Sequence, residues 1–145
     1  MLYTPPRQTD LLVTRRILAS PEALFAAWLD PAQPGSPWHG AQAAVVEARV
    51  GGLFYHCVVH EGREWAHYGR FLVLEHPRHI VHTWVSEATR GLETRVSLLF
   101  TAEGAQTLVT LQHAGVPDDA FGRQHVQGWE YVLGALTQGR AAAPR

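Results

Sequence analysis

The residues of this sequence that could do chemistry are mainly histidines, of which there are nine among 145 residues. His56 and His60 lie on the same face of a predicted strand, and His82 and His113 belong to strands that can lie beside it. Neutral imidazoles clustered in this way are common ligands of transition metals. However, the sequence has no HExxH or other fixed ligand spacing, and a histidine bonded to a backbone carbonyl has the same geometry. We therefore predict no metal ion and no other cofactor.

The same histidines could instead be acid–base groups. His82 and His113, together with His125 on a later helix, could transfer protons in a cyclase, dehydratase or hydrolase reaction. The sequence has no GxSxG motif, and Cys57, its only cysteine, is predicted on the strand face opposite His56. An activated nucleophile is therefore absent, and we assign no catalytic residue, with these three histidines kept as the alternative.

Composition favours a globular protein that binds neither nucleic acid nor membrane. Apolar residues make up 46% of the chain and charged residues 17%, and the formal net charge is −1. The basic residues are dispersed arginines, without the basic patch that binding to phosphate backbones needs. No apolar run approaches the roughly 18 residues of a membrane span, and the N-terminus has no apolar signal core. These features predict a cytoplasmic protein.

The first part of the chain is predicted to form a strand and a short helix. Residues 11–18 are rich in apolar and β-branched side chains, which is typical of a strand. Ser20 is expected to cap a helix that has Pro21 at its first position, and apolar residues recur at helical spacing as far as Leu29. Residues 31–42 contain three prolines and two glycines and are predicted to form a loop or a broken helix.

Six further strands and a long helix are expected after this loop. The strands are predicted at residues 43–49, 53–60, 65–74, 80–85, 94–100 and 107–113. Short turns join most of them, which indicates an antiparallel sheet, and Gly51-Gly52 marks a bend. Asp118 is expected to cap a single helix that runs to about Gln138, with apolar residues at spacings of three and four. The prediction is one α+β domain over residues 1–145, with frayed ends at 1–10 and 139–145.

Five segments, taken in order, resemble a known family. They are ASPEALFAAWLDP, RVGG, GRFLVLEHPRHIVHTW, TLVTLQHAGVP and QHVQGWEYVLGAL, and they span residues 11–138 together with the strands between them. The chain is similar to the activator-of-heat-shock-protein-90-ATPase-like (Aha-type) branch of the START-like (SRPBCC) superfamily. It departs from the usual pattern at Trp38-His39-Gly40, where relatives carry two adjacent tryptophans before the glycine, and at His82, which replaces a large apolar residue.

This resemblance implies the helix-grip fold, in which a curved sheet of about seven strands wraps around a long C-terminal helix and two short helices follow the first strand. It also implies a pocket between sheet and helix that holds hydrophobic molecules in relatives. The eukaryotic co-chaperones of the family carry a further N-terminal domain that this chain lacks, so the resemblance does not imply activation of a chaperone.

The alternation of side chains along strands predicts which residues line such a pocket. Trp28 and Trp38 are expected to close one end, and Gly128 to let the helix approach the sheet closely. The predicted ligand-binding residues are Trp28, Trp38, Phe54, His56, Val58, His82, Trp84, Val96, Leu98, His113, His125, Trp129 and Val132. We predict that they bind or sequester a small hydrophobic or aromatic ligand.

The opposite, convex face of the sheet is unusually apolar. Exposed apolar surface on a soluble protein often marks an interface, so we predict a homodimer through this face. A module that binds another protein, with a stress-related role, is the further alternative. The residues expected on this face are Leu53, Tyr55, Cys57, Val59, Val81 and Val85.

Overall fold

The computed structural model describes residues 4, 6–33, 36, 38, 41 and 43–141. In these residues the chain forms one sheet, three α-helices and a short 3-10 helix, η1. The elements are β1 (Gln8–Ile17), α1 (Pro21–Leu29), β2 (Ala43–Val46), β3 (Leu53–His60), β4 (Arg63–Glu75), β5 (His79–Ser86), η1 (Glu87–Thr89), β6 (Thr94–Glu103), β7 (Gln106–Pro117), α2 (Ala120–Arg123) and α3 (His125–Ala141).

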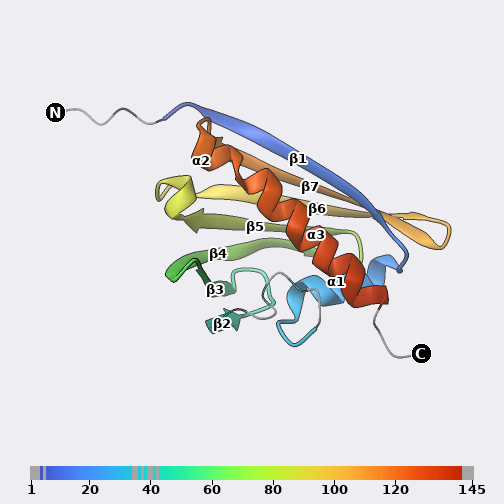
Figure 1. Cartoon of the computed structure of the whole chain (residues 1–145). Helices are drawn as coiled ribbons and strands as arrows, with labels where there is room; N and C mark the ends of the chain where they lie inside the picture. Colours follow the sequence, from blue (N-terminus) through green and yellow to red (C-terminus); the bar gives the residue numbers. More distant parts are fainter. Residues whose placement is uncertain are drawn as a thin grey trace.

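The seven strands form an antiparallel sheet in the order β1-β7-β6-β5-β4-β3-β2. From β3 to β7 each strand pairs with the next one along the chain through a short turn, or through η1 between β5 and β6, while β1 closes the far edge beside β7. In Figure 1, α3 crosses the face of this sheet. This is the helix-grip fold that the sequence predicts.

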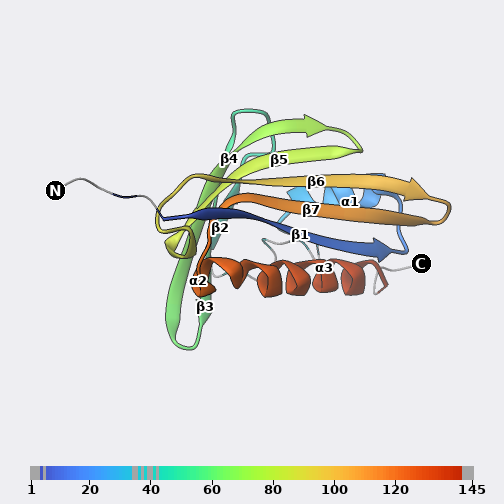
Figure 2. The ribbon, with the colours of Figure 1, turned by 90° about the horizontal axis from the view of Figure 1, so that it is seen from above.

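The sheet is bent around the beginning of the last helix. Figure 2 shows the β3–β4 hairpin turning out of the plane of β5, β6 and β7 and passing the end of α3 where α2 lies. A register shift between Phe71 and Val73 in β4 marks a bulge, and bulges increase local bending. Gly69 lies two residues earlier, where an added Cβ would be 2.3 Å from the Thr83 carbonyl oxygen, so only glycine fits there.

Helix α1 forms as its sequence predicts. The Ser20 hydroxyl accepts a hydrogen bond from the Ala23 backbone N–H at 3.1 Å, and Pro21 occupies the first turn. Leu24 and Trp28 are fully buried and join the core beneath the sheet. The second short helix is expected within residues 31–42, which the structure describes only in part.

The C-terminal helix differs from the single helix predicted from Asp118. Asp119, not Asp118, caps the short α2, and α3 begins at His125 after Gln124. At this junction the ring of His125 donates a hydrogen bond to the Gly122 carbonyl at 2.7 Å, so a side chain meets one of the carbonyls at the end of α2. Regular structure also reaches Gln8 at one end of the chain and Ala141 at the other.

The expected apolar stripe of α3 packs on the concave face of the sheet. Trp129, Leu133 and Leu136 are buried in the main hydrophobic core, and Val126 and Val132 are partly buried against it. The sheet contributes its inward side chains to the same core, among them Ile80, Val96, Leu98, Val109 and Leu111. The helix is therefore fixed over the sheet by burial of apolar surface.

The convex face is less exposed than expected along β5. Val81 and Val85 are buried on it, because β5 is the middle strand of the sheet and neighbouring side chains cover both of its faces. Cys57 of β3 is also buried on this face. Exposed apolar side chains on this face are instead concentrated towards the β2 edge, where Leu53, Tyr55 and Val59 are accessible.

Candidate functional site

A groove opens between the beginning of α3 and the β3–β4 side of the sheet. Its inner part is a cavity of about 180 Å³. Stacked imidazoles of His56 and His67, with ring centroids 4.6 Å apart, form part of its wall, and Trp84 lies against both. The helix contributes the remaining wall. The inner part is lined by His56, His67, Trp84, His125, Gly128, Trp129 and Val132.

The groove continues outward into a second, more open part of about 280 Å³. The two parts share His67, His125 and Gly128, so they form one continuous groove. Trp65 and Phe121 meet edge to face across the outer part, with ring centroids 6.0 Å apart. The outer part is lined by Val58, His60, Trp65, His67, Ala88, Phe121, Gln124, His125 and Gly128.

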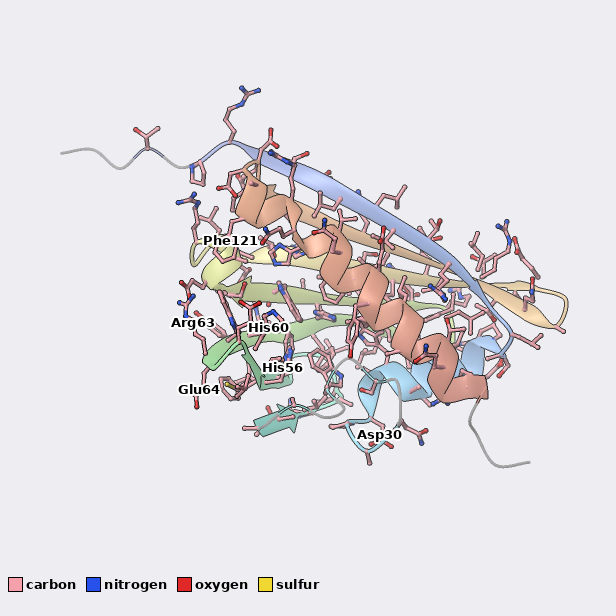
Figure 3. The ribbon with its side chains drawn as sticks, viewed as in Figure 1. Asp30, His56, His60, Arg63, Glu64 and Phe121 are labelled. Atoms are coloured by element: carbon pink, nitrogen blue, oxygen red, sulfur yellow. The ribbon has the colours of Figure 1, made fainter. Side chains whose placement is uncertain are left out.

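The open end of the groove lies at the tip of the β3–β4 hairpin. Figure 3 shows His60 and Arg63 of this hairpin at the same end of the molecule as Phe121 of α2, whereas Asp30 lies far from it. The Arg63 guanidinium lies over the Trp65 ring, 4.1 Å from its centroid, and is paired with the carboxylate of Glu87. This cation is therefore already neutralised, and the described residues that line the groove include no Asp, Glu, Lys or Arg.

Gly128 creates room in the groove rather than allowing close packing. A Cβ added at this position would have no atom within 4 Å, so the helix does not approach the sheet closely there. The expectation that Gly128 permits close contact is wrong. The missing side chain leaves space in the helical wall where the two parts of the groove join.

His113 is held in one tautomer by a chain of buried hydrogen bonds. Thr94 donates its hydroxyl proton to the Trp84 carbonyl at 2.6 Å, so the same oxygen accepts from Nε2 of His113 at 2.7 Å. Nδ1 of His113 then accepts from Nε1 of Trp129 at 3.0 Å. Both ring nitrogens therefore have structural partners, and the chain connects α3 to β5, β6 and β7.

His82 is also occupied by structural contacts. Its Nδ1 donates to the Thr83 carbonyl at 2.9 Å, and its Nε2 accepts from Nε1 of Trp28 at 3.4 Å. Trp38 donates from its own Nε1 to the Trp28 carbonyl at 2.6 Å. These rings lie within the packed core and not in the groove.

Burial keeps the inner histidines neutral, because an imidazolium loses its hydration there. Burial lowers the pKa of His56 to about 3 and that of His67 to about 4, and the pKa of His82 also falls to about 4. The pKa of His113 falls to about 2 for the same reason, and that of His125 is lowered. The groove therefore presents uncharged imidazoles at neutral pH.

The structure brings together part of the predicted ligand-binding set. His56, Trp84, His125, Trp129 and Val132 line the inner part, and Val58 lines the outer part. The other predicted residues are buried in the core and do not line the groove. These are Trp28, Trp38, Phe54, His82, Val96, Leu98 and His113.

Sequence reasoning missed His67 and Trp65, which line the groove from β4. The turn at residues 61–62 pairs His56 with His67 and Val58 with Trp65 across the β3–β4 hairpin. Directly opposed residues share a sheet face, so a two-residue turn at Glu61-Gly62 places both rings beside His56 and Val58. The three-residue turn Glu61-Gly62-Arg63 expected from the sequence shifts this register by one residue, which is why both rings were missed.

Comparison with known families identifies the chain. The family described as Activator of Hsp90 ATPase homolog 1-like protein matches residues 18–139, which is most of the sequence. The chain belongs to this family. No curated protein matches it.

Solved structures with this fold share little sequence with the chain. A protein from Chromobacterium violaceum superposes with a TM-score of 0.75 at 21% identity, over 90% of this chain and 96% of that one. CalU16 from Micromonospora echinospora has a TM-score of 0.66 at 22% identity, over 95% and 83% of the two chains. An Hsp90 activator from Plasmodium falciparum has a TM-score of 0.67 at 22% identity, over 86% and 96%. At these identities the likeness shows the fold alone.

The two departures from the pattern of the Hsp90-activator-like family differ in how far the structure describes them. His82 fits its buried position through the hydrogen bonds of both ring nitrogens. Trp38 is buried, while His39 and Gly40 lie outside the described residues.

Neither a metal site nor a membrane-spanning helix is found among the described residues. They contain no group of three or more His, Cys, Asp or Glu side chains placed to hold a metal ion. Within them, no helix has the length and apolar character to cross a membrane.

Proposed function

We propose that this protein binds a small hydrophobic ligand in the groove between α3 and the β3–β4 side of the sheet. The observation that carries this proposal is the groove itself, which has inner and outer parts of about 180 and 280 Å³ and walls made largely of aromatic rings. Small-molecule sites are concave and mostly apolar, with a few polar groups that orient the ligand. A cytoplasmic location stays a prediction.

The polar atoms along the groove also support binding. Nδ1 of His56 and Nε1 of Trp84 are buried, in residues only 4% and 5% exposed, and neither atom has a hydrogen-bond partner among the described residues. Buried polar atoms are almost always paired in folded proteins, so unpaired ones beside a cavity favour a missing partner. A bound molecule would supply one.

The enzymatic alternative retains one of its three histidines. His82 and His113 use both ring nitrogens in structural hydrogen bonds and have no free position for proton transfer. Of these three histidines, only His125 lines the groove. Non-catalytic binding therefore accounts for more of the observed contacts than catalysis does.

Substitution of Gly128 tests the binding site directly. Gly128→Leu would place a side chain into the open space at the middle of the groove. Fluorescence titration with the uncharged apolar probe N-phenyl-1-naphthylamine should show saturable binding to the wild type and a loss of at least about tenfold in affinity for Gly128→Leu. The matched control is Gly134→Leu on the same helix, where a Cβ contacts only the end of the Arg15 side chain, at 3.8 Å. Equal binding by all three proteins would contradict the proposal.

A further inference from the structure

His125 presents a hydrogen-bond acceptor to the groove. Its Nδ1 lies 2.7 Å from the Gly122 carbonyl oxygen, and a carbonyl can only accept, so Nδ1 carries the proton of the neutral ring. Nε2 then has a lone pair and no proton. It has no hydrogen-bond partner in the part of the chain that the structure describes, and the ring lines both parts of the groove.

The surroundings of His125 keep this acceptor unprotonated. The ring of His113 meets it edge to face, with centroids 4.8 Å apart, and no carboxylate is among the described residues that line the groove. Burial lowers the pKa of His125, and the hydrogen bond to the Gly122 carbonyl offsets only part of this effect. At neutral pH the groove therefore offers a lone pair where a cationic ring would offer a proton.

Flat rings surround the acceptor. Trp84 and Trp129 lie 4.8 Å apart between centroids and form the inner end of the groove, and Trp65 lies farther out. Aromatic walls of this kind favour a planar molecule that stacks on them. The indole N–H groups of Trp84 and Trp65 are buried and have no partner in the part of the chain that the structure describes. They are donors that an oxygen on such a molecule could meet after small side-chain movements.

The groove has no group that would compensate a charged ligand. Its described lining residues include no Asp, Glu, Lys or Arg, and the nearby Arg63 is bound to Glu87. Burying an unpaired charge costs far more than burying a hydroxyl that forms one hydrogen bond. Carboxylates and ammonium groups are therefore disfavoured.

We propose that the groove recognises an uncharged planar aromatic molecule bearing a hydroxyl or N–H group, and that this group donates a hydrogen bond to Nε2 of His125. This inference rests on the proposed function, because it requires that the groove takes a hydrophobic ligand. It adds the chemical class of that ligand and the residue that selects it.

Three probes of similar shape distinguish the binding of a hydrophobic ligand from the preference for a hydrogen-bond donor. 2-Naphthol has a donor, 2-methoxynaphthalene keeps the oxygen but lacks the donor, and naphthalene has neither. Leaving a buried acceptor without its donor is costly, so wild-type protein should bind 2-naphthol about 5- to 150-fold more tightly than 2-methoxynaphthalene. Binding is measured at pH 7.5 by quenching of tryptophan fluorescence and by calorimetry.

Variants of His125 assign the preference to this residue. His125→Phe should bind naphthalene with little change but lose the preference for 2-naphthol. His125→Gln should restore part of it, because an amide oxygen can also accept. The matched control is His60→Phe, since His60 lines only the outer part and should leave the preference intact. Should His125→Phe fold poorly, His125→Leu removes the acceptor with a smaller side chain and makes the same comparison.

Each outcome has one meaning. If none of the three probes binds, both the proposed function and this inference fail. If all three bind the wild type equally, ligand binding stands and the donor preference is overturned. If the preference for 2-naphthol survives in His125→Phe, the assignment to His125 is overturned.

Discussion

The histidines of this protein have different roles because their hydrogen-bond partners differ. Both nitrogens of His113 and of His82 are bonded to neighbouring groups, so these two rings join strands and helices together. His125 uses one nitrogen at the end of α2 and leaves the other at the groove. The alternation of side chains placed His82 and His113 on the inner face, but their partners come from distant parts of the sequence. Sequence periodicity therefore predicted their burial and could not predict their roles.

The hydrogen-bond chain through His113 should contribute strongly to stability. Thr94→Val removes the hydroxyl that bonds both the Trp84 carbonyl and Nε2 of His113, while keeping the size of the side chain. Two buried polar atoms then lack partners, which should lower the free energy of unfolding by about 2–4 kcal/mol. Urea denaturation measures this change. Thr101→Val on the same strand is the control, because Thr101 is exposed and should change stability by less than about 0.5 kcal/mol. A similar loss in both variants would contradict the assigned role of the chain.

Stability should fall as the solution is acidified below pH 6.5. In the unfolded chain a histidine takes up a proton near its ordinary pKa of 6.5, whereas in the folded protein the pKa of His56 is about 3 and that of His67 and His82 about 4. The unfolded state therefore binds more protons between these values, and acid favours unfolding. Each group should cost about 1 kcal/mol between pH 6 and pH 5. The contribution is complete above pH 6.5 and is lost as the pH falls towards the folded values.

A variant of His56 isolates the contribution of one histidine to the pH dependence of stability. Neither nitrogen of the His56 ring has a hydrogen-bond partner in the described residues, so His56→Phe should be tolerated at pH 7.5 and should reduce the dependence of stability on pH by about one proton. The control is His60→Gln, whose side chain is 71% exposed in the wild type and should leave the pH dependence unchanged. Denaturant unfolding at several pH values between 7.5 and 5 measures the slope. A wild-type stability that stays constant over this range would refute the prediction.

At the scale of elements, the break between α2 and α3 positions the groove. Apolar spacing predicted one helix, because the spacing continues across residues 118–138. Before the interruption, α2 packs closely on the end of β7 at Gly122, where an added Cβ would lie 2.0 Å from the Pro117 carbonyl oxygen. These two residues are only five apart in the sequence, but apolar spacing carries no information about a close approach between backbone atoms. With α2 fixed there, Phe121 and His125 lie together at the groove.

Gly122 should therefore tolerate no side chain. Gly122→Ala forces backbone to move at the β7–α2 connection and should lower the free energy of unfolding by about 1–3 kcal/mol, as overpacking does elsewhere. Gly134→Ala on α3 is the matched substitution, because its added Cβ makes only an ordinary contact at 3.8 Å. There the better helix propensity of alanine should stabilise the protein by up to about 1 kcal/mol. Thermal and urea unfolding of the two variants show whether each substitution lowers or raises the free energy of unfolding. A Gly122→Ala variant with unchanged stability would show that the close contact with Pro117 does not constrain this position.

At the scale of the whole molecule, the fold could be predicted and the position of the binding groove could not. Turn residues, the alternation of side chains along the strands and the apolar stripe of the helix predicted the sheet and α3. Each of these patterns depends on residues that are neighbours in the sequence. The groove depends on how far the β3–β4 hairpin bends around α3 and on the space left at Gly128. For that reason Trp28 and Trp38 are packed core, and the cavity lies beyond the rings of Trp129 and His56 that they contact.

The same curvature leaves an apolar surface on the outside of the sheet. Val45, Tyr55 and Tyr68 are directly opposed across β2, β3 and β4 and are exposed, and Leu53 and Val59 extend this surface along β3. Large exposed apolar patches commonly mark interfaces, and a patch that pairs with itself forms a two-fold dimer. The homodimer expected from the sequence would use this surface, shifted towards the β2 edge because Val81, Val85 and Cys57 are buried.

Placing a charge in this surface should separate the dimer. Tyr68→Glu places a carboxylate in this surface beside Tyr55, where association would bury the charge among apolar side chains, so the dissociation constant should rise by at least about tenfold. Analytical ultracentrifugation at tens of micromolar protein measures the association. Leu12→Glu is the matched control, because Leu12 is also exposed but lies on β1 at the opposite edge of the sheet. A wild-type protein that sediments as a monomer, or a Leu12→Glu variant that dissociates as readily as Tyr68→Glu, would exclude this surface as the interface, and the groove would then function in a single chain.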